Sequence, residues 1–416
     1  MPTIVVKTSE GLSGNVKISG SKNSSLPILA ACILTKGKNI ISNIPDLSDI
    51  RIMYSLMESL GVKIDIKNTE TIVDCEKINN YKTIYELVGK MRASFLLSGA
   101  LLARLGKARI ALPGGCPIGT RPIDLHLKGF SAMGAEISQG HGYIELEANK
   151  LRGAKIYLDF PSVGATENIM IAATLAEGET IIENAAAEPE IIDLTEFLKK
   201  QGAIIEGAGS DTIKIRGVRE LNPTVHNVIP DRIEAGTFMT AFASTRGRGI
   251  IENVNYSHIK PVVAKMCEMG IEIKEIGNDC LQIDANRELK TSDVKTLPFP
   301  GFPTDMQAPF TVLLNSIEGT GIIIETVFEN RFLHIGELNR MGANIKIDGR
   351  TSVIEGGKKL TGTKVNAFDL RGGAALVLAG MNAKGITEIS GVEYIDRGYE
   401  NFVKKLEKIG AKIYLD

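Results

Sequence analysis

The feature that most constrains the fold of this chain is an internal repeat. Six times, the end of an amphipathic helix is followed by a glycine and a short alternating strand, at Gly61, Gly134, Gly202, Gly270, Gly342 and Gly410. A second series of helix, glycine and strand alternates with the first, at Gly37, Gly106, Gly178, Gly247, Gly319 and Gly385. Solenoid repeats usually have periods of about 20–50 residues. The spacing here, of about 70 residues with two helices per copy, instead predicts an α/β fold of six subdomains grouped three and three.

The last copy shows the physical logic of the repeat. Phe402, Val403, Leu406 and Ile409 fall on one stripe of a helix, which predicts that this face is buried. Gly410 supplies the left-handed conformation that ends a helix. The letters "AKIYLD" that follow alternate between apolar and polar residues, as a half-buried strand does.

Charge and composition exclude several classes of protein. The chain has 48 basic and 49 acidic residues, so a nucleic-acid clamp, which needs basic excess, is disfavoured. It has neither an apolar signal peptide nor an apolar run of about 18 residues, so we expect a cytoplasmic protein without membrane contact. The five cysteines include no CxxC pair, and no residues show metal-ligand spacing. We therefore expect reduced thiols, no metal and no cofactor.

The helices of the second series should begin with charged or small polar residues. Counting back 14 to 16 residues from each glycine of this series gives Lys22, Arg92, Ser162 or Gly164, Asp231, Asp305 and Arg371. Helix N-termini attract anions. Capping explains Ser and Asp at such places but not Lys or Arg, so the basic members predict an anion site. For Asp231 and Asp305, capping and function both remain open.

One cysteine lies in an unusual loop, "LPGGCPIGTRP" at residues 112–122. Most lone cysteines are buried small apolar residues, and we expect this for Cys32, Cys267 and Cys280. The neighbours of Cys116 are turn residues with little apolar surface, which favours an exposed, catalytic thiol with Arg121 holding an anion beside it. The buried alternative stays open on these residues alone.

Many segments together resemble one family. They are "GSKNSSLPILAA", "MRASFLLSGALLARLGKARIALPGGCPIGTRPIDLHL", "SVGATENIMIAATLAEGETIIENAAAEPEIIDL", "PDRIEAGTF", "FPTDMQAPF", "ETVFENRFLHIGELNRMGA", "DLRGGAALVLAG" and "IDRGYE". In order and spacing, and over essentially the whole chain, they resemble the UDP-N-acetylglucosamine 1-carboxyvinyltransferase family of enolpyruvyl transferases.

The resemblance implies a fold and a reaction. The fold would be a two-domain inside-out α/β barrel of six βαβαββ repeats, three per domain. One domain would span residues 22–229, and the other would combine 1–21 with 230–416, with hinges near 20–22 and 229–231. The enzyme would transfer the enolpyruvyl group of phosphoenolpyruvate to the 3-hydroxyl of UDP-N-acetylglucosamine and release phosphate, the first committed step of peptidoglycan synthesis. These two small molecules would be its partners, with no obligate protein partner.

The resemblance also implies residue roles. Cys116 would be the general acid and the target of fosfomycin, and Asp305 would either take the proton of the hydroxyl or only orient it. Asn23 would steady the intermediate, while Lys22, Arg121 and Arg397 would bind phosphoenolpyruvate. The same cleft would hold Arg92, Asp369 and Arg371. The uracil would be held by Arg121, Pro122, Ile123, Asp124 and Leu125, the diphosphate by Ser162, Val163 and Gly164, and the sugar by Val327.

The chain departs from the family at one position, and two rival functions stay open. Phe160 stands where some family members carry a lysine, so a diphosphate salt bridge is expected to be absent. His126 lies within the uridine segment and is expected to be structural. The rivals are a 5-enolpyruvylshikimate-3-phosphate synthase-type transferase, which would lack a cysteine loop of this kind, and a non-catalytic sugar-nucleotide-binding paralogue.

Overall fold

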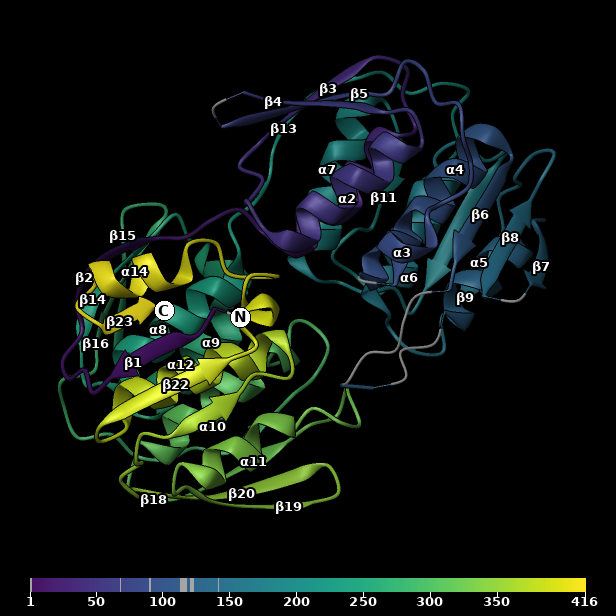
Figure 1. Ribbon diagram of the computed structural model, residues 1–416. Helices are drawn as coiled ribbons and strands as arrows, with labels where there is room; N and C mark the ends of the chain where they lie inside the picture. Colours follow the sequence, from purple (N-terminus) through teal and green to yellow (C-terminus); the bar gives the residue numbers. More distant parts are fainter. Residues whose placement is uncertain (1, 68, 90, 113–117, 120–122, 141) are drawn as a thin grey trace. The chain divides into compact units, whose positions relative to one another are not determined.

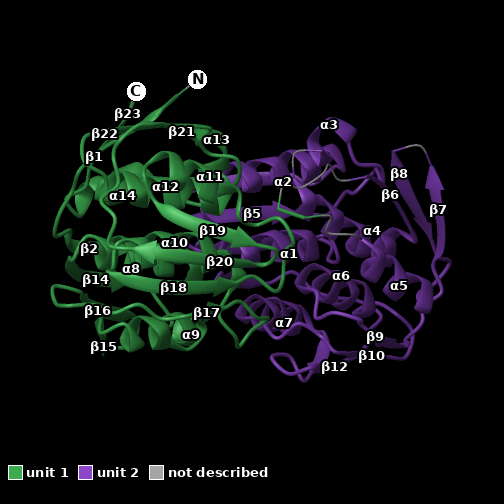
Figure 2. Cartoon of the chain, turned by 90° about the horizontal axis from the view of Figure 1, so that it is seen from below, with its two compact units in different colours: residues 1–19, 116–119, 230–416 green, residues 20–115, 120–229 purple. Residues whose placement is uncertain are grey.

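The computed structural model describes residues 2–67, 69–89, 91–112, 118–119, 123–140 and 142–416. The predictions made for Cys116, Arg121 and Pro122 lie outside these residues. The chain forms two compact units (Figure 2), of which unit 1 comprises residues 1–19, 116–119 and 230–416, and unit 2 comprises residues 20–115 and 120–229.

The chain alternates short strands and helices throughout both units (Figure 1). Unit 2 contains α1 (Lys22–Cys32), β3 (Lys38–Ser42), α2 (Ser48–Ser59), β4 (Lys63–Lys67), β5 (Glu70–Asp74), α3 (Tyr85–Val88), the 3₁₀ helix η1 (Arg92–Leu96), α4 (Leu97–Leu105), β6 (Lys107–Ala111), α5 (Asp124–Ala132), β7 (Glu136–Gly140), β8 (Tyr143–Glu147), β9 (Lys155–Tyr157), α6 (Val163–Ala173), β10 (Glu179–Glu183), α7 (Pro189–Gln201), β11 (Ile204–Glu206), β12 (Thr212–Arg216) and β13 (Val225–Asn227).

Unit 1 follows the same pattern. It contains β1 (Ile4–Lys7), β2 (Ser13–Lys17), α8 (Arg232–Ser244), β14 (Arg248–Glu252), α9 (Tyr256–Glu268), β15 (Glu272–Ile276), β16 (Cys280–Asp284), β17 (Val294–Lys295), the 3₁₀ helix η2 (Thr304–Met306), α10 (Gln307–Asn315), β18 (Gly319–Ile324), α11 (Leu333–Arg340), β19 (Asn344–Asp348), β20 (Thr351–Gly356), β21 (Lys364–Asn366), α12 (Leu370–Asn382), β22 (Ile386–Ser390), α13 (Val392–Ile395), α14 (Phe402–Lys408) and β23 (Lys412–Leu415).

Within the described residues, six sheets repeat one strand order, three in each unit. In five of them an outer strand pairs in parallel with its neighbour, and the remaining pairs are antiparallel: β9-β10-β12-β11, β13-β3-β5-β4, β2-β14-β16-β15, β17-β18-β20-β19 and β21-β22-β1-β23. The sixth, β6-β8-β7, has an isolated parallel bridge from Lys82 to Arg109 at the outer position. The six-copy, three-and-three repeat predicted from glycine spacing is confirmed.

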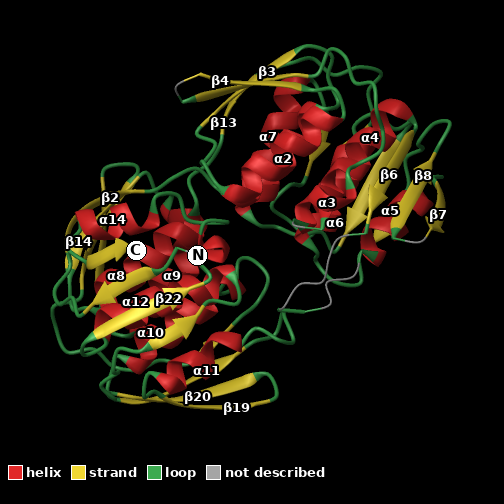
Figure 3. Cartoon of the chain, viewed as in Figure 1, coloured by secondary structure: helices red, strands yellow, loops and turns green. Residues whose placement is uncertain are grey.

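The helices of the two glycine series differ in burial. Those of the second series, α1, α4 and α6 in unit 2 and α8, α10 and α12 in unit 1, contact one another at the centre of their unit. Every residue of α6 from Ala165 to Ala173 is buried, including the polar Glu167 and Asn168. The first-series helix α9 buries only one stripe, Ile259, Val262, Val263 and Met266. Figure 3 shows the strands of unit 1 outside its helices.

The glycine markers have the expected backbone conformation with one exception. All six first-series glycines have positive φ, including Gly410 at +99°, and Phe402, Leu406 and Ile409 are buried as the stripe predicts. In the second series Gly247 has no positive φ, and the preceding Arg246 takes the left-handed conformation instead, at φ 56°.

The prediction for the cysteines outside the loop is only partly right. Cys32 is buried as expected, whereas Cys267 is exposed and Cys280 is half-buried. Cys267 lies on α9 outside the buried stripe of that helix. Cys280 begins β16, whose inward-facing residues are Leu281 and Ile283. In both cases the period of the element decides the exposure of the thiol, and residue type alone does not.

The described part of the chain contains neither a membrane-spanning helix nor a cluster of metal-ligating side chains. No helix in it is long and apolar enough to cross a membrane. No group of three or more His, Cys, Asp and Glu side chains in it could hold a metal ion.

Candidate active site

The residues predicted to begin the second-series helices do lie at helix starts. Lys22 is the first residue of α1, and Arg92 is the first residue of η1, which leads into α4. Ser162 and Asp231 are the N-cap residues of α6 and α8. Asp305 lies in η2 directly before α10, and Arg371 is the second residue of α12. The sequence repeat therefore places these six side chains at equivalent positions.

Four acceptor side chains at these starts cap their helices, among them Ser21 of α1, whose Oγ accepts from Ser24 N at 3.3 Å. Asp231 Oδ1 accepts hydrogen bonds from Ile233 N (2.8 Å) and Glu234 N (2.9 Å). Asp369 Oδ1 accepts from Arg371 N (3.0 Å) and Gly372 N (2.9 Å). Ser162 Oγ accepts from Ala165 N at 3.4 Å. Of the two alternatives left open at Asp231, the structure shows capping.

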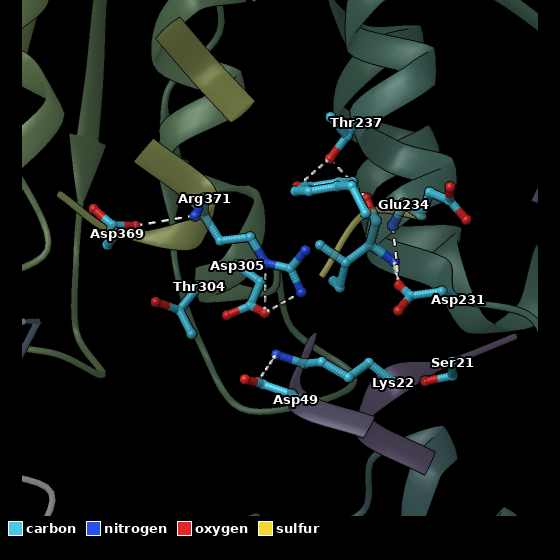
Figure 4. Close-up of polar contacts among 12 residues, drawn as sticks. Ser21, Lys22, Asp49, Asp231, Glu234, Thr237, Thr304, Asp305, Asp369 and Arg371 are labelled. Atoms are coloured by element: carbon cyan, nitrogen blue, oxygen red, sulfur yellow. Dashed lines mark hydrogen bonds and ion pairs between the residues drawn. The ribbon is translucent and has the colours of Figure 1, made fainter. Parts of the chain in front are cut away.

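Asp305 does not cap a helix, because two arginines occupy its carboxylate; Figure 4 shows one of them, Arg371. Arg331 Nη2 donates to Asp305 Oδ1 at 2.6 Å. Arg371 donates to Oδ2 through Nε (3.0 Å) and Nη2 (2.8 Å). The side chains of Arg331 and Arg371 are 5% and 3% exposed, against 25% for Asp305. The carboxylate is thus the accessible member of a largely buried triad.

The two guanidinium groups determine the protonation of Asp305. Burial alone would raise the pKa of this carboxyl, but the charges of Arg331 and Arg371, with the hydrogen bonds they donate, hold it well below its usual value. Because the carboxylate is stabilised as an anion, it is a poor proton acceptor in this arrangement.

A second layer of hydrogen bonds positions Arg331. Its Nη1 donates to Thr304 Oγ1 (2.7 Å), and Thr304 Oγ1 donates to Glu325 Oε2 (2.8 Å). Glu325 is fully buried, and its Oε1 accepts from Val327 N at 2.8 Å. Glu325 therefore links the backbone at Val327, through Thr304 and Arg331, to the carboxylate of Asp305.

Arg371 is held by aromatic and polar neighbours as well. Its guanidinium lies 5.2 Å from the ring centroid of Tyr399, and Tyr399 Oη is 2.9 Å from Thr237 Oγ1. Arg397, two residues before Tyr399, is half-buried in the turn that follows α13. His334 is buried, 3.4 Å from Thr311 Oγ1 through Nε2.

Within the cysteine loop, Ile118 and Gly119 are described and belong to unit 1. Ile118, two residues after Cys116 in the sequence, is buried, and its carbonyl accepts from Asn330 N at 3.2 Å. Asn330 directly precedes Arg331. This segment of the loop therefore packs beside the residues that surround Asp305.

In unit 2, Lys22 pairs with a carboxylate that the sequence analysis did not single out. Lys22 Nζ lies 3.3 Å from Asp49 Oδ2, and the two side chains are 11% and 3% exposed. Asp49 stands in the first turn of α2, where an acidic residue is ordinary, so its local pattern does not indicate a role. Asn23, next to Lys22, is half-buried.

Arg92 and His126 lie near the start of α6. Burial, followed by the charge of Arg92, lowers the pKa of His126 to about 3, so the ring is neutral. Asn168 Nδ2 donates to His126 Nδ1 at 3.0 Å, which leaves the proton on Nε2. A Cβ added at Gly164 would lie 3.5 Å from His126 Cε1. The imidazole therefore packs beside the segment predicted to hold a diphosphate.

The remaining predicted binding residues lie on two short segments. Ile123 is the N-cap of α5, Asp124 is exposed in its first turn, and Leu125 packs against the core. Val163 begins α6. Phe160 is 43% exposed, and its carbonyl accepts from Ser162 N at 2.7 Å. The contacts of these residues with substrate remain predictions.

Sequence reasoning missed Arg331 and Glu325 as well as Asp49. None of the three begins a second-series helix, so the repeat gave no reason to select them. Arg331 stands four residues after Val327 in the segment "ETVFENRFLH", which is the only sequence signal that could have drawn attention to it.

Comparisons with known proteins match most or all of the chain. The family model of EPSP synthase (3-phosphoshikimate 1-carboxyvinyltransferase) matches residues 6–406. The UDP-N-acetylglucosamine 1-carboxyvinyltransferase 2 of Clostridium tetani is 55% identical over 416 residues, which is 100% of both chains. The UDP-N-acetylglucosamine 1-carboxyvinyltransferase 1 of Caldanaerobacter subterraneus is 56% identical over 410 residues, 99% of this chain and 98% of that one.

Solved structures show the same fold. The enolpyruvyl transferase NikO from Streptomyces tendae superposes with a TM-score of 0.91 at 25% identity, over 100% of this chain and 99% of that chain. The EPSP synthase of Acinetobacter baumannii superposes with a TM-score of 0.77 at 19% identity, with the same coverage.

Proposed function

This chain belongs to the EPSP synthase (3-phosphoshikimate 1-carboxyvinyltransferase) family, and we propose that it transfers the enolpyruvyl group of phosphoenolpyruvate to the 3-hydroxyl of UDP-N-acetylglucosamine, releasing phosphate. The observation that carries this choice of acceptor is the identity of 55–56% with full-length relatives named for that reaction. On this proposal it is a transferase of peptidoglycan synthesis and acts in the cytoplasm, where phosphoenolpyruvate is made.

The chemistry requires proton transfers both when the hydroxyl adds and when phosphate leaves. The sugar hydroxyl adds to C2 of phosphoenolpyruvate and loses its proton, while C3 gains one. The C2–O bond to phosphate then breaks, and C3 gives up a proton to restore the double bond. Phosphoenolpyruvate carries a phosphate and a carboxylate, so cations must hold it, and we assign Lys22, Arg121 and Arg397 to it. Asn23 completes this set by contacting the intermediate.

We assign Asp305 to the acceptor hydroxyl. Because Arg331 and Arg371 lower its pKa, Asp305 would accept a hydrogen bond from the hydroxyl and orient it rather than take its proton before C–O bond formation. The proton would leave only as positive charge develops on the attacking oxygen. Of the two roles left open by the sequence, the electrostatics support orientation.

Three further residues complete the Asp305 cluster on this proposal. Arg371, with its backbone held at the Asp369 cap, and Arg331 fix the two carboxylate oxygens from different sides. Buried Arg331 Nε has no hydrogen-bond partner among the described residues. An unpaired buried donor costs about 1–3 kcal/mol, and such costs are typical of functional sites rather than of structural ion pairs.

Cys116 would deliver the proton to C3. A thiol with an ordinary pKa of about 8.5 is mostly protonated at neutral pH and can donate. Fosfomycin, an epoxide, would alkylate it. Intact-protein mass spectrometry after incubation with fosfomycin and UDP-N-acetylglucosamine should show one adduct, located at Cys116 by peptide mapping. Full activity with an unmodified Cys116 would remove it from the mechanism.

The nucleotide would be held by unit 2. We assign the uracil to Arg121, Pro122, Ile123, Asp124 and Leu125, and the diphosphate to Arg92 and the α6 start at Ser162, Val163 and Gly164, where helix N–H groups favour anions. Val327 of unit 1 would contact the sugar. Because Phe160 carries no charge, the diphosphate would depend on the helix start and Arg92.

Phosphate release with two alternative acceptors tests the proposed function. The purified chain with phosphoenolpyruvate should release phosphate when UDP-N-acetylglucosamine is added and not when shikimate 3-phosphate is added. Release with shikimate 3-phosphate alone would favour the 5-enolpyruvylshikimate-3-phosphate synthase reaction. Binding of UDP-N-acetylglucosamine by calorimetry without any phosphate release would favour the non-catalytic paralogue.

A further inference from the structure

The chain passes between its units at residues 19–21 and 229–231, and these two segments are paired. Asp231 N donates to Ser19 O (2.9 Å) within unit 1, and Ser21 N donates to Ile229 O (2.7 Å) within unit 2. Gly20 stands between them, and a Cβ there would lie 1.6 Å from Asn43 O, so only glycine fits. Lys22 and Asn23 follow directly, so whatever holds this segment also places both side chains.

A buried carboxylate in unit 2 holds the far end of the segment. Asp193, on α7, is 5% exposed. Its Oδ2 accepts from Ser24 Oγ at 2.5 Å and from Ile229 N at 3.3 Å, and its Oδ1 lies 2.9 Å from His226 Nε2. Ser24 is the residue after Asn23 in the first turn of α1. Asp193 therefore ties that turn to both β13 and the second crossing.

A buried carboxylate in unit 1 holds the near end. Glu234, on α8, is 1% exposed, and its Oε2 accepts from Ser19 N at 2.7 Å. Lys405 Nζ bridges Glu234 Oε1 (2.6 Å) and Ser19 Oγ (2.6 Å), and Ser19 Oγ donates to Glu400 Oε2 at 2.6 Å. The charged groups facing Glu234 are Lys405 from α14 and Asp231 at the N-cap of α8.

We propose that Asp193 and Glu234 are positioning residues for phosphoenolpyruvate, which fix the two ends of segment 19–24 so that Lys22 and Asn23 meet the substrate. Neither carboxylate touches substrate in this proposal, which rests on the proposed function. Each accepts a backbone N–H at one crossing, Ile229 for Asp193 and Ser19 for Glu234. Such contacts fix the path of the main chain, which a packing role alone does not require.

Three variants and two matched controls test the proposal. Asp193→Asn leaves fewer acceptors than the three donors around it, Ser24→Ala removes one donor without changing charge, and Glu234→Gln removes the partner of Lys405. Thr195→Ala on α7 and Thr240→Ala on α8 each remove a buried hydroxyl that bonds only within its own helix, to Ile191 O (2.9 Å) and Gly236 O (2.8 Å).

Steady-state kinetics separate positioning from stability. We expect KM for phosphoenolpyruvate to rise about tenfold in each of the three variants, with KM for UDP-N-acetylglucosamine within about twofold of wild type, because small misplacements of binding groups are costly. The two controls should change neither KM. Equal changes in both KM values, or no change in either, would overturn the proposal.

Hydrogen–deuterium exchange tests the same proposal without activity. Amides of residues 19–26 should exchange faster in Asp193→Asn and Ser24→Ala than in Thr195→Ala, with other regions unchanged. Equal exchange in variants and control would overturn the positioning role even in an active enzyme. If wild type releases no phosphate, the proposed function fails, while faster exchange in the variants would still show that the carboxylates hold this segment.

Discussion

The starts of α1 in unit 2 and α10 in unit 1 carry opposite charges at the same position of the repeat. In unit 2 the start of α1 carries a cation, Lys22, which lies 3.3 Å from the carboxylate of Asp49. In unit 1 the segment entering α10 carries a carboxylate, Asp305, and two arginines hold it. Both are near the positive end of a buried helix, which favours the carboxylate and opposes the lysine.

On the proposed function, this difference adapts one duplicated scaffold to two substrates. A cation at a helix N-terminus strengthens a site for an anion such as phosphoenolpyruvate. A carboxylate at that end, held as an anion by two arginines, has a fixed direction and low basicity, which suits orienting a neutral hydroxyl. Residues from other elements offset the burial of each charge. Asp49 pairs with Lys22, and Arg331 and Arg371 pair with Asp305.

The largest effect is expected where the carboxylate side of the comparison is removed. Asp305→Asn should lower kcat about 1,000-fold, because the amide orients the hydroxyl poorly and offers one acceptor where two guanidinium groups donate. Initial rates of phosphate release measure it, with KM for phosphoenolpyruvate within a few-fold of wild type. Asp348→Asn, an exposed carboxylate in unit 1, is the control. A kcat near that of wild type would exclude Asp305 from orientation and from base catalysis.

Glu234, a second carboxylate in unit 1, sharpens the comparison because its pKa is raised, whereas that of Asp305 is lowered. Burial, only partly offset by Lys405, raises the pKa of Glu234 from 4.5 to about 7. The folded state therefore binds more protons than the unfolded state between these pH values, so its contribution to stability is present at low pH and lost as pH rises.

Denaturant unfolding measures this contribution. The free energy of unfolding of wild type minus that of Glu234→Gln should fall by about 3 kcal/mol between pH 4 and pH 8. A difference that stays constant or rises with pH would show that Glu234 is not a raised-pKa carboxyl.

The cationic side of the comparison is tested at Lys22. Lys22→Met should raise KM for phosphoenolpyruvate about 100-fold, because one charge-assisted contact to the anion is lost. KM for UDP-N-acetylglucosamine should stay within about threefold of wild type. Lys38→Met, at an exposed position of β3, should change neither value. In the double variant Lys22→Met with Asp49→Asn, KM for phosphoenolpyruvate should stay as high as in Lys22→Met alone. Recovery of this KM would mean that the Lys22–Asp49 pair is structural.

The smallest effect is expected when the charge is kept and only the geometry changes. Arg331→Lys keeps the cation but cannot reach both Thr304 Oγ1 and Asp305 Oδ1 with separate nitrogens. We expect kcat to fall about tenfold. Arg340→Lys, on α11 with a side chain 58% exposed, is the matched control. An equal loss in both variants would remove Arg331 from the cluster.

The sequence predicted those parts of the molecule that depend on local rules. Glycine spacing gave the six copies, because Gly61 and Gly410, like the other four glycines of their series, end a helix in the left-handed conformation. Counting back from the second series gave the helix starts, so Lys22, Asp305 and Arg371 were found by position before any contact was known.

What the sequence could not predict depends on contacts between distant elements. Arg331 is 26 residues from Asp305, and Asp49 is 27 residues from Lys22, with nothing in either local pattern to join them. Arg246 in place of Gly247 and the exposed Cys267 show a related limit. Small changes of register leave the sequence pattern intact, while they move a left-handed turn by one residue or turn a thiol toward solvent.

The most direct test is the product formed in D₂O. If the hydroxyl adds to C2 while C3 takes a proton, the sugar nucleotide product must carry an enolpyruvyl group with deuterium in its vinyl methylene, because the methyl intermediate mixes solvent deuterium into that carbon. Mass spectrometry and proton NMR should show this product only when phosphoenolpyruvate and UDP-N-acetylglucosamine are both present. An enolpyruvyl product free of deuterium, or no such product, would contradict the account.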